Sequence, residues 1–182
     1  KAPAVKRQRI FLAFNTFWQC SKDIELIFIA GNHDIADEAG TCTIESFESF
    51  AKVVLPGDFS TAGYALLIPY GKPDEICKMI KDYGGPDTNI LLSHFGVVGC
   101  DMGYGKLSVE GVSMDDLKGF RQIFLGHYHL ARWPYVGCLC PVDLKAPNQP
   151  GRMIILDDET AEYEVIENSA PRFLKLTQED ID

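Results

Sequence analysis

Long apolar runs and positive charge are both scarce in this sequence. Apolar runs such as 26–30 and 65–68 are far shorter than the roughly 20 residues of a membrane-spanning helix. The apolar stretch 10–14, which follows a few basic residues, is too short for a secretory signal. The sequence has 17 basic and 26 acidic residues. The resulting net charge of -9 argues against binding nucleic acid by phosphate neutralisation alone. A phosphate-binding site would therefore need positive charge from another source.

Cysteine is too thinly spread to form a disulfide framework. The six cysteines are distributed over 182 residues, and a chain of this length can be stabilised by burial alone. We therefore expect a reducing, cytoplasmic environment. The length predicts one domain over residues 1–176, with 177–182 as a polar tail or the start of an omitted segment. Residue 1 is lysine, which indicates a processed chain or one that begins partway into a longer gene product.

Apolar spacing and turn residues predict alternating helices and strands. The expected helices are 5–23, 44–54, 73–83 and 113–118. The expected strands that alternate with them are 24–30, 64–70, 89–92 and 122–125. Three later strands, 135–139, 152–156 and 162–166, lack intervening helices and predict a second, antiparallel sheet. The glycine-rich segment 96–111 is expected to be a surface loop, and the whole pattern predicts an α/β fold.

All four histidines come directly after the end of a predicted strand. His33 follows strand 24–30, His94 follows 89–92, and His127 and His129 follow 122–125. Because ligands bind at the carboxyl ends of strands in open α/β sheets, we expect these imidazoles to lie at one edge and to meet at a metal. A single histidine in such a place is more often a hydrogen-bonded structural group, but four together favour a site.

The residue types around these histidines suit borderline-to-hard divalent ions. In extended backbone His127 and His129 face the same side, while Tyr128 turns away. Their separation of about 6–7 Å suits two ions about 3.5–4 Å apart. Asn32 adds an amide oxygen, and such ligands suit Mn, Fe, Zn or Ni. Asp34 is most simply a group that orients His33 or its turn.

Three short motifs resemble the last three motifs of the calcineurin-like metallophosphoesterases. They are Gly31-Asn32-His33-Asp34, Ser93-His94 and Gly126-His127-Tyr128-His129. The strand 27–30, the Asp115-Asp116-Leu117 helix, and the tail segments 151–157 and 169–173 are most similar to SbcD-type DNA repair exonuclease subunits, phage versions included. The motif resemblance covers 24–130, and the subfamily resemblance covers 108–173.

The resemblance implies a layered α/β/β/α sandwich with mixed sheets, lacking its first strands. It implies two divalent ions, manganese first with Fe, Zn or Ni as alternatives. Asn32, His94 and His127 would bind the second ion, and His129 the first. His33, held by Asp34, would be the proton donor or transition-state stabiliser during in-line attack of an activated water on a phosphodiester. The implied partners are DNA, an SbcC-type ATPase subunit and a second copy in a homodimer.

Two motifs of that family, Asp-x-His and Gly-Asp, do not precede Gly31. Gly57-Asp58 comes too late and lies in a turn, so the bridging carboxylate is absent. Because residues 1–23 resemble the helix that follows the family's second strand, we expect roughly 50 or more further residues upstream, about a third of a typical domain. Without a carboxylate, two close cations repel each other. We therefore expect this chain alone to bind at most one ion weakly and to hydrolyse little.

Other functions stay open at this stage. The same site would also suit a phosphatase or phosphodiesterase that acts on small phosphoesters, because the metal motifs indicate a phosphate ester but not the alcohol to which the phosphate is joined. Loss of the first two motifs would suit a non-catalytic scaffold.

The sequence also offers further ligand and substrate contacts. A structural zinc site could use His127, His129, Cys138 and Cys140, although the spacing of the two cysteines is too short for a usual knuckle. Lys106 and Arg132 flank the expected crevice and are candidates for contacts to phosphate, and Tyr104 in the glycine loop is a further candidate for a substrate contact.

Overall fold

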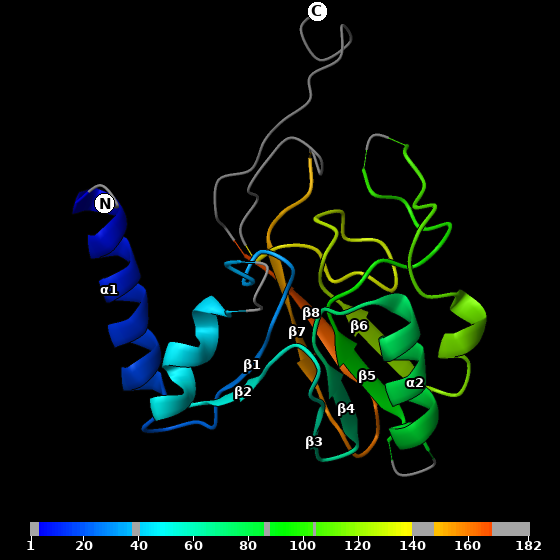
Figure 1. Cartoon of the computed structure of the whole chain (residues 1–182), viewed down its shortest axis with the longest axis horizontal. Coiled ribbons are helices and arrows are strands. Elements are labelled where there is room, and N and C mark those ends of the chain that lie inside the picture. The colour runs from blue at the N-terminus through cyan, green and yellow to red at the C-terminus, as the bar shows by residue number, and fades with distance from the viewer. Residues whose placement is uncertain (1–3, 38–40, 86–87, 104, 140–147, 169–182) are drawn as a thin grey trace, which may run out of the picture.

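The centre of the protein is a four-stranded mixed sheet. The computed structural model describes residues 4–37, 41–85, 88–103, 105–139 and 148–168. The strands of this sheet lie in the order β3-β4-β5-β6, with β3 antiparallel to β4 and the others parallel (Figure 1). Their bounds are Ser60–Ala62, Ala65–Ile68, Ile90–Ser93 and Gln122–Leu125. Uninterrupted apolar runs form β4 and most of β5, as expected for parallel strands covered on both faces.

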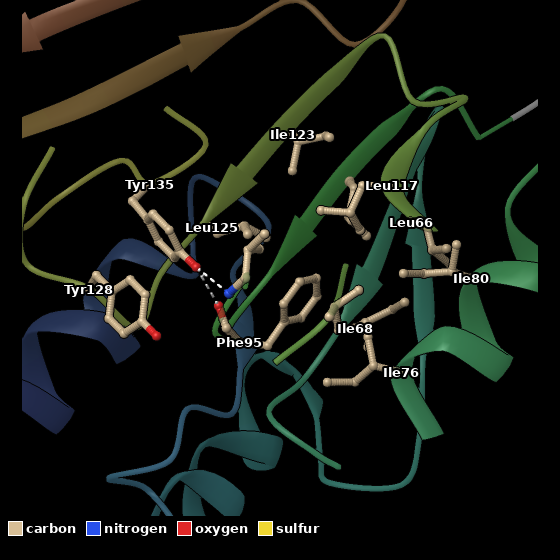
Figure 2. Packing of buried hydrophobic residues seen from close by; sticks show 13 residues of the cluster. Leu66, Ile68, Ile76, Ile80, Phe95, Leu117, Ile123, Leu125, Tyr128 and Tyr135 are labelled. Carbon is tan, nitrogen blue, oxygen red and sulfur yellow. Dashed lines mark hydrogen bonds between the residues drawn. The ribbon is translucent and has the colours of Figure 1, made fainter. Parts of the chain in front are cut away.

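One face of the sheet is covered by helices. The helix α2 (Pro73–Tyr83) starts at a first-turn proline and buries Ile76 and Ile80, while the 3-10 helix η2 (Met114–Leu117) buries Leu117. Figure 2 shows this core between the helices and the sheet. It contains the alternate strand residues Leu66, Ile68, Leu91, Ile123 and Leu125.

The other face is covered by a two-stranded antiparallel hairpin. It consists of β7 (Arg152–Leu156) and β8 (Tyr163–Glu167). Ala161 of the connecting turn packs on Ala65 and Ile90, and the ring of Tyr163 lies 5.1 Å from that of Phe124. The described residues thus form helix, sheet and hairpin layers, which confirms the α/β class.

A smaller unit precedes the sheet. The strand β1 (Ile27–Ile29) pairs in parallel with β2 (Lys52–Val54), and the 3-10 helix η1 (Thr43–Ser49) lies between them in sequence. The helix α1 (Ala4–Cys20) stands beside η1 (Figure 1) and contacts it through Phe14 and Phe17. The backbone N–H of Tyr70 donates to the carbonyl of Ala30, which places the exit of β1 beside the exit of β4.

Several predicted elements are confirmed and others are wrong. Helix 73–83 and strands 122–125 and 152–156 have the predicted bounds. The predicted helix 44–54 is wrong in its second half, because the β-branched pair at 53–54 joins β1 as β2. The predicted strand 135–139 is reduced to a single bridge between Tyr135 and Leu125.

The glycine-rich segment 96–111 is anchored more firmly than its composition predicted. Val97 is completely buried, and it forms a bridge with Val112, which is 1% exposed. The short strand β3 was not predicted. The helix α1 is also only partly covered, because Phe17 and Trp18 remain 36% and 44% exposed. Among the described residues, no helix is long and apolar enough to span a membrane.

Candidate metal centre

The exits of four strands meet at one edge of the protein. Ile68 pairs with Ser93 and Ser93 pairs with Leu125, so β4, β5 and β6 end in register. The Gly126 N–H donates to the carbonyl of Ser93, which holds the last two exits together. Together with the Tyr70 to Ala30 bond that joins β1 to β4, this register confirms the predicted convergence of the strand ends.

Three nitrogen and oxygen donors lie at the centre of this edge. The Oδ1 atom of Asn32 lies 3.0 Å from Nε2 of His94 and 3.3 Å from Nδ1 of His127. The ring centroids of the two histidines are 5.4 Å apart. Donors that bind one ion at about 2.1 Å are themselves about 3.0–3.4 Å apart, depending on whether the geometry is octahedral or tetrahedral. Both distances from Asn32 are those of hydrogen bonds, and both also fall within the range for ligands of one divalent ion.

The ring of His94 is held between two glycines. A Cβ on Gly31 would lie 2.8 Å from Cε1 of His94, and a Cβ on Gly126 would lie 2.6 Å from its Nδ1. Any larger residue at either position would displace the ring. This close approach gives a physical reason for glycine before Asn32 and before His127.

The backbone at His127 has an unusual conformation. Its φ of 89° lies in the region that favours glycine, and a non-glycine residue there costs about 1–3 kcal/mol of strain. The expectation of a simply extended segment at 127–129 is therefore wrong. Tyr128 nevertheless turns into the core, where it is 8% exposed, as the alternation predicted.

Burial favours the neutral form of the two central histidines. Desolvation lowers the pKa of His94 from 6.5 to about 4, with a further lowering from the charge of His127 and smaller effects of His33 and His129, while Asp34 opposes them. Desolvation also lowers the pKa of His127, again with contributions from His33 and His129. His33 and His129 therefore lie within electrostatic reach of both His94 and His127. A neutral imidazole keeps the lone pair that a metal ligand needs.

Asp34 closes the turn that carries Asn32 and His33. Its Oδ2 accepts a hydrogen bond of 2.8 Å from the N–H of Gly31, and its carbonyl accepts one from the N–H of Thr43. The ring of His33 is exposed beside this turn. Asp34 therefore orients the turn, which was one of the two predicted roles, and it presents His33 at the rim of the site.

The three predicted substrate contacts have different outcomes. Tyr104 lies outside the described residues. Lys106 is exposed on the glycine-rich loop. Arg132, whose side chain is 67% exposed, forms an ion pair of 3.0 Å with Asp101, so it ties the segment after His129 to the glycine-rich loop. Its guanidinium is therefore already engaged by a carboxylate.

A cleft of about 300 Å³ opens beside His127. Its lining includes Tyr70, Phe95, Met102, Val109 and Tyr128. The ring of Tyr70 lies 5.9 Å from that of His127 at an interplanar angle of 29°. Tyr70 was not among the site residues predicted from the sequence, although it follows the exit of β4 just as the histidines follow the exits of their strands. Selection of residues that come directly after a predicted strand, which identified the histidines, could therefore have identified Tyr70 as well.

The carboxamide of Asn32 is essential to this candidate centre. In the part of the chain that the structure describes, no group of three or more His, Cys, Asp and Glu side chains is placed to hold an ion. The described residues of the alternative zinc site are His127, His129 and Cys138, and they do not form such a group. Cys140 lies outside the described ranges. No disulfide bond joins the cysteines that the structure describes.

The fold and site define an α/β protein with an imidazole and carboxamide cluster at the carboxyl ends of the parallel strands of a mixed sheet. No protein-family model matches the chain, and no curated protein matches it either.

Proposed function

We propose that this chain is part of a metal-dependent phosphodiester hydrolase of the metallophosphoesterase kind, acting on DNA in recombination or repair. The cluster of Asn32, His94 and His127 carries the proposal, because the distances from its carboxamide oxygen to the two imidazole nitrogens are those between ligands of one ion. The order of the motifs along the chain and the helix, sheet and hairpin layers support the same family. The whole protein would have an α/β/β/α sandwich.

The residues of the cluster would hold the cation. Asn32, His94 and His127 would bind the second ion, and His129, which lies within electrostatic reach of both rings, would bind the first. When bound, the ions would lower the pKa of the attacking water and stabilise charge on the phosphoryl oxygens. The glycines on both sides of His94 leave the room that its ring occupies, since a Cβ at either position would collide with the ring.

His33 would act on the phosphate ester itself. Its ring is exposed at the rim, on a turn that Asp34 closes, so a substrate can reach it. From there an imidazole can hydrogen-bond a phosphoryl oxygen or give a proton to the leaving oxygen, which typically contributes about 100-fold to 10,000-fold in rate.

The cleft beside His127 favours a second candidate, hydrolysis of small phosphoesters. Its volume of about 300 Å³ is at the lower end of small-ligand pockets, which run from about 300 to 1,000 Å³. Its apolar and aromatic walls suit the organic group of an ester. DNA would need further contacts, for which an SbcC-type partner or a second copy of the chain are the proposed sources.

Variants of the proposed ligands test the function. We expect the chain to bind one Mn²⁺ weakly in a calorimetric titration, and Asn32→Ala and His127→Ala to abolish that binding. His33→Ala is the matched control, since it should bind Mn²⁺ normally and lose about 100-fold or more of any hydrolysis. The substrates are single-stranded DNA, double-stranded DNA and nitrophenyl phosphate.

The outcomes separate the candidates. Cleavage of nitrophenyl phosphate but not DNA would support the small-ester function. A folded chain that neither binds Mn²⁺ nor hydrolyses any substrate would support the scaffold. Unchanged Mn²⁺ binding in His127→Ala would contradict the proposed centre, and tight binding of two ions would contradict the expectation of a single weak one.

A further inference from the structure

We propose that Tyr135 is a positioning residue, which holds the loop after β5 and the loop after β6 in register so that His94 and His127 face the same point. The loops meant are 94–97 and 126–130. This inference rests on the proposed function, because it concerns the proposed metal ligands.

The hydroxyl of Tyr135 binds the loop that carries His94. The N–H of Val97 donates to Oη of Tyr135 at 2.7 Å, and the Tyr135 hydroxyl donates to the carbonyl of Phe95 at 3.2 Å. Figure 2 shows both bonds as dashed lines converging on the one hydroxyl. Phe95 directly follows His94, so the bonds fix the backbone within three residues of that ring. All three residues are 4% exposed or less.

The rest of Tyr135 is attached to the loop that carries His127. Its ring packs on that of Tyr128 at a centroid distance of 4.6 Å, and Tyr128 lies between His127 and His129 in the chain. The neighbouring backbone runs along the end of β6, since Leu125 N–H donates to the carbonyl of Pro134 and Val136 N–H donates to the carbonyl of Leu125. One side chain therefore connects both histidine loops.

Tyr128 of loop 126–130 also lies against loop 94–97, because a Cβ on Gly96 would lie 2.8 Å from its Oη, but the two hydrogen bonds to Phe95 and Val97 come from Tyr135. The Gly126 to Ser93 bond joins the strand ends themselves. Desolvation raises the pKa of Tyr135, so its hydroxyl stays protonated and able to donate. Ligand groups need placement to within about 0.5 Å of their productive geometry, and supporting hydrogen bonds supply such precision.

The test removes the hydroxyl and keeps the ring. In Tyr135→Phe we expect the fold to persist, the imidazole NMR signals of His94 and His127 to shift or broaden in the metal-free chain, and Mn²⁺ affinity to fall about 10-fold to 100-fold. Ile80→Val perturbs the same core far from the loops, and it should keep Mn²⁺ affinity within about twofold of the wild type.

The outcomes distinguish a positioning role of the Tyr135 hydroxyl from a contribution to stability alone. If Tyr135→Phe leaves the imidazole signals unchanged and its Mn²⁺ affinity equals that of Ile80→Val, the proposal is wrong. If the wild type binds no Mn²⁺, the proposed function fails, but the imidazole signals still test Tyr135. If the variant does not fold, hydrogen exchange at the Val97 amide of the wild type decides. The proposal requires exchange as slow as in β5, and fast loop-like exchange overturns it.

Discussion

At the scale of single residues, the site depends on His94 and its surroundings. His94 lies between Gly31 and Gly126, and its Nε2 atom faces the carboxamide of Asn32. Strand-exit positions predicted this histidine from the sequence. The need for glycine on both sides could not be predicted, because it arises only when two distant turns approach the same ring.

We predict that His94 titrates at about pH 4 in the metal-free chain. Burial and the positive charges of His127, His33 and His129 lower its pKa from 6.5, although Asp34 partly opposes them. The unfolded chain therefore binds more protons than the native state between pH 6.5 and about 4, so stability should fall as the pH is lowered through this window. NMR titration of the ring measures the pKa, and denaturant unfolding measures the stability.

The variant His94→Gln provides the control for this titration. In this variant the free energy of unfolding should lose the part of its pH dependence that comes from protonation of the His94 ring, while the fold remains intact. A His94 midpoint near 6.5 in the wild type would contradict the burial of the ring.

At the scale of elements, the strongest predictions came from clear local signals. Pro73 and the apolar spacing after it predicted α2, and the run 122–125 predicted β6. The segment 50–54 was misassigned because its helix-like apolar spacing competes with pairing to β1, a partner more than 20 residues away. The bridge between Val97 and Val112 likewise depends on tertiary contacts.

The aromatic cluster that attaches α1 gives a prediction at this scale. Phe47 of η1 contacts Phe14, Phe17, Phe28 and Phe50, with ring centroids 4.9–5.9 Å away. Because Phe47 is only half-buried, Phe47→Ala should cost about 2 kcal/mol, below the usual range for a fully buried phenylalanine.

The loss of stability in Phe47→Ala should appear mainly as local opening of α1. Hydrogen exchange of the α1 amides should become faster, while exchange in β4 and β5 changes little, because those strands belong to a separate core. Phe47→Leu keeps an apolar group there and should show a smaller effect. An equal increase of the exchange rates in α1 and in the central sheet would contradict the separation of the aromatic cluster from the core of the sheet.

At the scale of the whole molecule, charge limits the ways in which the chain can hold a substrate. The net charge is -9, and Arg132 is already paired with Asp101. A cation bound by neutral imidazole and amide groups would be the principal local positive charge at the sheet edge. The acidic composition by itself predicts this need for a cation.

We predict that the chain alone holds DNA weakly. Without a basic surface it releases few counterions, so its affinity should be no tighter than non-specific binding, about 10⁻⁴ M at physiological salt. A fluorescence anisotropy titration with labelled single-stranded and double-stranded DNA, with and without Mn²⁺, measures this affinity. Submicromolar binding without Mn²⁺ would contradict the prediction and would require a positive surface that the composition does not suggest.

The sequence by itself determined the α/β class, the bounds of α2, β6 and β7, and the placement of four histidines at strand exits, because each of these follows from local periodicity or chain order. Only the tertiary structure decided that Asn32, His94 and His127 share one point, that His127 has a positive φ, that Tyr70 lies beside it, and that Tyr135 links the two loops. These features depend on strand register and on contacts between residues up to 95 positions apart. Such contacts leave no periodic signal in the sequence.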